Sequence, residues 1–417
     1  MLQRQIFKFI LAAWVISAFG FPFPGNAEEP SGITLRPLTI HPLLKIKYGF
    51  DSNVFRRGSQ ALPGYAEPLT RVSSTFIDLI PELGLESKLW NWSLIFNLRV
   101  HLTYFQDQEA GRQSTTSYPE FLGNHLIKWK SPGQGFNFEL EEKWRLTSDP
   151  IIQDIPYPLG GERVKRFYNQ LAGGLDYTSR SGFFIGKLRY GWERNQYNNS
   201  LLKQMNYGVQ NLTLRGEDRF LPKTAVSLSV RYRNANWDSP DFGRERNYDS
   251  LNLSGWFNGQ VTEKLGAIVS LGFEGIRFRE GNYSGEPVGT FELIYKPLVT
   301  SNINLRYQRS VNPSITSRNY ITNIFEFLTE FRDLRPRGLE LNLGLEFDLD
   351  QYAGLEDRDV KIYHGRVGVF YQLGGALDWL KLGTEYAGEF SRCNGLDYQP
   401  YYEYNDHQIS FLVNASY

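Results

Sequence analysis

The residues closest to a catalytic arrangement lie at the end of the chain. Asp406, His407 and Ser410 supply an acid, a base and a hydroxyl within a short stretch, and a hydrolase uses such groups to activate a nucleophile. The stretch, which continues as "QISFLVNASY", alternates apolar and polar residues and therefore predicts a β-strand. His407 and Ser410 are three positions apart, so on a strand they point to opposite faces. We predict no catalytic residues and expect that the protein is not an enzyme.

The sequence also contains no motif typical of a metal-binding site. The segment "DLDQYAGLEDRD", residues 348–359, gathers carboxylates, but it lacks the third acidic ligand and the terminal Glu of a calcium-binding loop. Cys393 is the only cysteine, which excludes an internal disulfide and a cysteine zinc cluster. We expect no metal and no cofactor.

Most of the charged residues form one face of alternating segments. In "LELNLGLEFDL", residues 339–349, leucines alternate with Glu, Asn, Gly and Asp, and "FNFELEEKWRL", residues 136–146, repeats the pattern. About 18 such segments follow one another, from near 43–54 to near 405–417, and each would form a strand with one apolar and one polar face. Aromatic residues make up 15% of the chain, which suits such strands.

The links between these segments alternate in length. Short links such as "SKLWN", "SPGQG" and "SRSG" take turns with longer ones such as "DSPDFGRERN" and "CNGLDYQPYYEYN". Short turns on one side and long loops on the other are typical of bacterial outer-membrane barrels. We therefore predict an all-β transmembrane antiparallel up-and-down β-barrel of about 18 strands, with short periplasmic turns and longer extracellular loops. A soluble β-sandwich is the alternative that alternation alone leaves open.

The amino terminus indicates secretion. Arg4 and Lys8 precede an apolar stretch, and small residues lead to Ala27, as in a cleaved signal peptide. An uncleaved membrane anchor is the alternative, but the apolar run is short for a spanning helix. We predict a signal peptide at 1–27, a periplasmic segment at 28–42 and an outer-membrane barrel at 43–417. The formal net charge of +0 argues against nucleic acid as a partner.

Several motifs carry a family resemblance. The segments "YGFDSNVFRR", "STFIDLIPELGLES", "LTSDP" and "EPVGTFELIYKPLVTSNINLRYQRS" resemble landmarks of an outer-membrane β-barrel porin family that is associated with bacterial exopolysaccharide and capsule gene clusters. The resemblance implies an integral barrel, and for some members a role as the exit of a polysaccharide secretion system. It brings no catalytic residues.

The polar stripe of each strand should face the lumen of such a barrel. A lumen of this width can be aqueous, and charges of mixed sign on its wall could set a transverse field. The alternative is that these charges only solvate and brace the wall. The lumen-facing candidates are Arg99, His101, Glu139, Glu141, Lys143, Arg145, Lys187, Arg189, Arg231, Arg233, Glu340, Glu346 and Asp348.

Tyrosines in two expected extracellular loops are candidates for contact with a glycan. A tyrosine offers an apolar face and a hydroxyl, which suits a sugar; loop packing is the alternative role. These candidates are Tyr157, Tyr398, Tyr401 and Tyr402.

The final strand has a second expected role. Its apolar residues should face lipid, and its aromatic ending resembles the terminal signal by which outer-membrane barrels are recognised for assembly. Phe411, Val413 and Tyr417 are the predicted assembly signal.

Three functions follow from these expectations. The first is a porin-like channel that exports a polysaccharide, with a periplasmic export protein and a glycan cargo as partners. The second is a structural or assembly barrel with a plugged lumen, and the third is a general diffusion porin for small solutes. All three place the protein among outer-membrane lipid and lipopolysaccharide, and all require the barrel assembly machinery.

Overall fold

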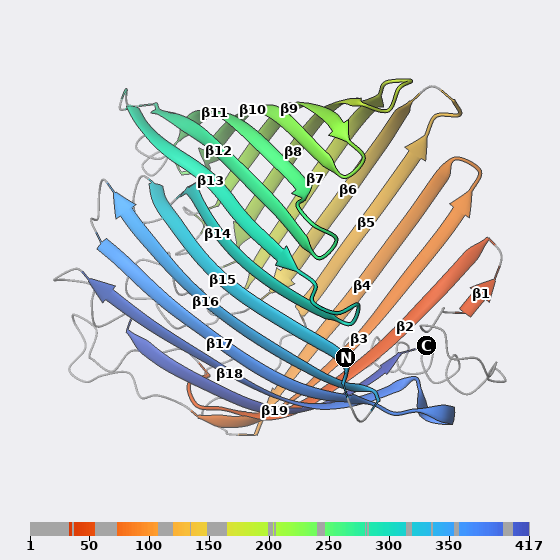
Figure 1. Cartoon of the computed structure of the whole chain (residues 1–417). Helices are drawn as coiled ribbons and strands as arrows, with labels where there is room; N and C mark the ends of the chain where they lie inside the picture. Colours follow the sequence, from red (N-terminus) through yellow and green to blue (C-terminus); the bar gives the residue numbers. More distant parts are fainter. Residues whose placement is uncertain are drawn as a thin grey trace.

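A computed structural model shows the arrangement of the chain (Figure 1). It describes residues 33–35, 37–54, 73–106, 120–133, 135–147, 165–198, 203, 206–239, 247–279, 281, 283–313, 319–334, 337–353, 358–394 and 403–416. Within these ranges, no helix is long and apolar enough to cross a membrane. The predicted signal peptide at 1–27 lies outside them.

Nearly all of the described residues belong to strands, which alternate direction along the chain. The strands are β1 (Ile33–Leu35), β2 (Leu38–Asp51), β3 (Ser74–Leu89), β4 (Trp92–Phe105), β5 (Glu120–Lys130), β6 (Phe136–Thr147), β7 (Arg166–Thr178), β8 (Phe184–Tyr197), β9 (Tyr207–Leu221), β10 (Thr224–Trp237), β11 (Tyr248–Gln260), β12 (Leu265–Phe278), β13 (Tyr283–Tyr295), β14 (Ser301–Pro313), β15 (Asn319–Leu334), β16 (Leu339–Ala353), β17 (Arg358–Gln372), β18 (Leu380–Asn394) and β19 (Tyr404–Ser416). One 3-10 turn, η2 (Gly375–Leu377), precedes β18.

The sheet closes on itself. Each strand from β2 to β18 pairs antiparallel with the next one, and β19 returns to pair with β2, with Phe411 opposite Tyr48. The short β1 only extends the start of β2 as a hairpin. The barrel therefore consists of the 18 strands from β2 to β19, which confirms the predicted fold class. Its first strand begins at Leu38, ahead of the expected barrel start at residue 43.

Alternation along the strands separates an apolar outside from a polar inside. Leu214, Leu228 and Leu271 are 61%, 69% and 74% exposed on the outer surface, while their sequence neighbours Arg215, Ser229 and Ser270 point inward. Only lipid removes such an apolar belt from water, and only a closed barrel satisfies its backbone groups within lipid. The protein is an integral β-barrel of the bacterial outer membrane.

Candidate functional site: two charged walls of the lumen

The predicted lumen residues all lie on the inner face of the strands. Each has the parity opposite to the exposed apolar side chains of its strand, as Glu340, Glu346 and Asp348 have relative to Leu345 on β16. The same holds for the candidates on β4, β6, β8 and β10. The inner face of the wall is therefore rich in charge of both signs.

On β3 to β5 the inner charges bind one another across strands. The ring of His101 lies 3.2 Å from the Asp78 carboxylate and 3.5 Å from that of Glu120, so one histidine bridges three strands. Arg99 pairs with Glu82 at 2.8 Å, and Arg145 reaches Glu120 at 3.5 Å. Such pairs brace the wall and leave little net charge.

The charges of β6 are more exposed. Glu139 pairs with Lys128 at 3.3 Å and Lys143 with Glu141 at 2.8 Å, and three of these four side chains are more than a third exposed. Pairs of this kind add about 0–1 kcal/mol of stability. These pairs therefore add little to the stability of the wall, which was their alternative role. Their charges are accessible from the lumen.

Strands β8 to β10 form a basic wall. Lys187 and Arg189 of β8 lie beside Arg215 of β9, while Arg231 and Arg233 follow on β10. Arg189 has its own partner, Asp176 of β7, at 2.6 Å, whereas Glu217 is shared by Lys187 at 3.1 Å and Arg215 at 3.7 Å. Shared carboxylates leave this part of the wall positively charged.

The buried carboxylate of Glu274 anchors the far edge of the basic wall. It lies on β12 and is 1% exposed; Arg231 contacts it at 3.1 Å and Arg233 at 3.9 Å. The hydroxyl of Ser250 donates a further hydrogen bond of 2.8 Å to it. The pairing fixes the direction of both guanidinium groups.

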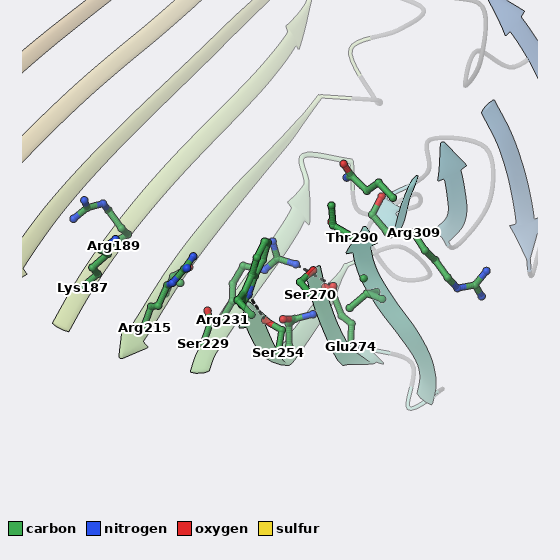
Figure 2. Close-up of a pocket in the computed structure, with 17 residues that line it drawn as sticks. Lys187, Arg189, Arg215, Ser229, Arg231, Ser254, Ser270, Glu274, Thr290 and Arg309 are labelled. Atoms are coloured by element: carbon green, nitrogen blue, oxygen red, sulfur yellow. Dashed lines mark hydrogen bonds and ion pairs between the residues drawn. The ribbon is translucent and has the colours of Figure 1, made fainter. Parts of the chain in front are cut away.

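A pocket of about 390 Å³ lies against this wall (Figure 2). Five cations and one carboxylate, Glu274, line it, together with hydroxyl and amide side chains of β9 to β14 and the ring of Trp256. The guanidinium of Arg215 lies 5.2 Å from the centre of that ring. The pocket offers hydrogen-bond donors and positive charge to an anion. Its cations are Lys187, Arg189, Arg215, Arg231 and Arg309.

The opposite wall carries the opposite charge. A second pocket, of about 330 Å³, is lined by four carboxylates against His364 and Arg366. His364 lies between Glu346 at 3.7 Å and Glu389 at 3.2 Å. Among the described residues, no group of three or more His, Cys, Asp or Glu side chains is arranged to hold a metal ion. The carboxylates of this pocket are Glu326, Glu346, Glu389 and Asp406.

In the circular strand order the two pockets occupy adjoining arcs, because β14 pairs with β15, and it is the cations on β8 to β10 that lie across the lumen from the acidic pocket. The basic one lies on β8 to β14 and is centred on β10 and β11, whereas the acidic one lies on β15 to β19. Figure 1 shows β8 to β10 and β16 to β19 on opposite sides of the barrel. Walls of opposite sign create an electric field across the lumen.

Two residues of the predicted assembly signal lie on the outer face of β19. Phe411 and Val413 point outward, 59% and 38% exposed, where they meet lipid. Tyr157, Tyr398, Tyr401, Tyr402 and Tyr417 lie outside the described residues.

Comparison with known proteins gives a likeness of fold. No family model matches the chain, and no curated protein matches it. Among solved structures, it resembles the outer membrane protein OpdK of Pseudomonas aeruginosa, at 11% identity and TM-score 0.48 over 92% of this chain and 99% of that one. It resembles OccAB3 of Acinetobacter baumannii at 12% identity and TM-score 0.48, over 92% and 100% of the two chains.

A BenF-like porin of Pseudomonas fluorescens Pf-5 is similar at 13% identity and TM-score 0.49, again over 92% and 100% of the two chains. At such identities and TM-scores, the likeness transfers no substrate to this chain. The assignment as an outer-membrane barrel rests on its closed sheet and its apolar outer belt.

Sequence reasoning missed the clustering of the cations. Arg215 and Arg309 were not among the candidates, although both line the basic pocket. Their position there depends on which strands are neighbours and how far each is staggered. The alternation of "NLTLRGED", residues 211–218, could have identified Arg215 as inward-facing.

Proposed function

We propose that the protein is a passive channel for small hydrophilic solutes, in which anionic groups interact with the basic pocket and cationic groups with the opposite wall. The observation that carries this proposal is that the cations of the basic pocket on β8 to β10 lie across the lumen from the acidic pocket on β15 to β19. A solute with polar groups can exchange hydrogen bonds with either wall without a deep energy minimum, as conduction requires. No chemical step is needed, so the proposal is a channel and not an enzyme.

Swelling of liposomes that contain the purified protein tests this function. Liposomes should swell in isotonic solutions of small sugars and small organic anions, with rates that fall as the solute grows larger. Liposomes prepared in the same way without the protein serve as the control. Absence of swelling with every solute would contradict the channel and favour a plugged structural barrel.

Polysaccharide export is a second candidate function. It is supported by the resemblance of the sequence motifs and by the uncharged lining of the basic pocket on β11, where Asn252 and Ser254 lie beside the ring of Trp256. Amides and hydroxyls next to an aromatic face suit a hydroxyl-rich chain. Loss of surface glycan on gene deletion, with normal uptake of small solutes, would favour export over diffusion.

A further inference from the structure

The wall of the barrel is incomplete between β13 and β14. Their pairing runs only from Tyr295 opposite Ile303 to Gly289 opposite Arg309. Beyond this rung, residues 283–288 pair only with β12, and residues 310–313 pair only with β15. We call this unpaired stretch the seam. It reaches the end of the barrel that carries the longer links, which we expect to be extracellular.

Two prolines explain why the pairing stops. Continuing the register would place Pro287 opposite Val311 and Gly285 opposite Pro313. The carbonyl of Pro287 points toward β14, because it accepts a hydrogen bond from Arg309. The N–H and C=O groups of one strand residue face the same neighbour, so the donor that Pro287 lacks is one that β14 would need. Pro313 removes the donor of the next rung in the same way.

A single proline in this barrel has a smaller effect. The pairing of β3 with β4 skips Ile80 and Pro81 and resumes at Glu82 opposite Arg99. Between β13 and β14, prolines on the two facing strands fall on successive hydrogen-bonded rungs, and there the pairing ends. The positions of Pro287 and Pro313 in the sequence therefore determine where the seam begins.

Side chains take over the bonds that the seam lacks. Arg309 reaches across it, donating to the Pro287 carbonyl at 2.9 Å and to the Glu286 carboxylate at 3.2 Å. Arg233 donates from the inside to the carbonyl of Val311 at 3.4 Å. Unsatisfied backbone groups in lipid cost several kcal/mol each, so these arginines stabilise an interrupted wall. Figure 2 shows Arg309 turned away from Lys187 and Arg231.

The seam borders the basic pocket and an apolar cluster. Val288 and Ser310, the first residues beyond the last rung, both line the pocket. Val311 is 3% exposed and packs in a cluster with Ile276 and Phe278, against which Val288 also packs. Ile276, Phe278 and Val288 have inner-face parity on their strands, so positive charge and buried apolar side chains meet on the luminal side of the interruption.

We propose that the seam is a lateral opening, latched by Arg309, through which a single-chain amphipathic anion passes between the basic pocket and the outer leaflet. The anionic head binds the cations of the pocket, and when the Arg309 latch opens, the alkyl chain passes from the luminal side between Val288 and Val311 to lipid. The proposal uses the basic pocket of the proposed function, but it does not require the conduction of small solutes.

Photolabelling in lipid vesicles tests the proposal. The probe is decyl sulfate with a diazirine at the end of its chain, added to the protein in vesicles, and mass spectrometry locates the labelled residues. In the natural protein, we expect label on Val288, Val311 and other residues at the seam. The double variant Pro287→Val/Pro313→Val restores both donors and should reduce this labelling on the order of tenfold, because the lateral path is closed.

A variant of Arg309, the residue that bridges the seam, provides a second test with the opposite expected result. Arg309→Gln removes the bridging charge and should increase labelling at the seam severalfold, even if the double variant fails to assemble. Pro81→Val and Arg332→Gln make the same chemical changes away from the seam and should leave the labelling unchanged. Labelling confined to outer residues such as Leu271, or unaltered by both test variants, would overturn the proposal. Loss of small-solute swelling with seam-dependent labelling intact would refute only the proposed channel.

Discussion

Gln408 of the last strand lies directly opposite Asp51 of the first barrel strand, and its side-chain amide donates a hydrogen bond of 3.0 Å to the Asp51 carboxylate. The contact joins residues from the two ends of the chain at the point where the barrel closes. Closure removes the two exposed edges that an open sheet would present to lipid.

Gly49 makes the closure possible, and its replacement should prevent it. It lies on the inner face of β2 opposite Ser410, and a Cβ at this position would be 2.5 Å from the Ile409 carbonyl and 2.8 Å from the Phe76 ring. Gly49→Val should therefore sharply reduce the fraction of protein that migrates as a compact band on an unboiled detergent gel. Gly191→Val adds the same side chain where the nearest atom is 3.8 Å away. An equal loss in both variants would show that closure is not the cause.

Charge on the outer belt should be costly. Leu345 is 50% exposed on the lipid side of β16, and an arginine facing the bilayer interior there should lower the free energy of unfolding by roughly 2–4 kcal/mol. Denaturant titration of the protein refolded in lipid measures this change. Glu346→Arg places the same charge on the inner face and should cost about 1 kcal/mol or less. Similar costs for the two variants would refute the assignment of faces.

His101 should contribute to stability through the two carboxylates that it bridges. His101→Ala leaves Asp78 and Glu120, both under 10% exposed, without their shared partner, at a cost of roughly 1–3 kcal/mol. Lys88→Ala breaks the pair with Glu86 at 2.9 Å, where the lysine is 76% exposed, and should cost about 0–1 kcal/mol. The same denaturant titration compares the two variants. An equal loss of unfolding free energy would show that the His101 bridge stabilises the barrel no more than an exposed ion pair does.

The end of the chain should matter for assembly more than for conduction. We propose that Phe411, Val413 and Tyr417 form the signal that the assembly machinery recognises. Deletion of Tyr417 should lower the amount of barrel in the outer membrane severalfold, while each inserted barrel conducts normally. Leu380→Ser removes a lipid-facing side chain from the neighbouring strand and should leave the amount unchanged. Normal amounts after deletion of Tyr417 would refute the signal.

The strands were predictable from the sequence because alternation of apolar and polar residues is a local property that most of them show along much of their length. The alternating segments 136–146 and 339–349 lie within β6 (Phe136–Thr147) and β16 (Leu339–Ala353), and the last segment, expected near 405–417, forms β19 (Tyr404–Ser416). The start of β2 at Leu38 was missed, since Pro42 interrupts the alternation ahead of the clearer run from Leu44.

The site was less predictable than the fold. Parity identifies which charges face inward, but the separation of Arg215 from Glu389 across the lumen depends on the circular order of the strands. The seam depends on Pro287 and Pro313 reaching facing positions, which only the register of two strands reveals. Both features arise from pairing between strands, whereas alternation is a property of each strand alone.

The current through single barrels in a planar bilayer tests the central claim most directly. With a salt gradient across the bilayer, the natural protein should give a steady ohmic current, and its reversal potential should report the balance of the two walls. Arg215→Gln weakens the basic pocket and should shift permeability toward cations by about twofold, whereas Glu389→Gln should shift it toward anions by a similar factor. Barrels that insert but pass no current, or variants that leave the reversal potential unchanged, would contradict a channel with two opposed charged walls.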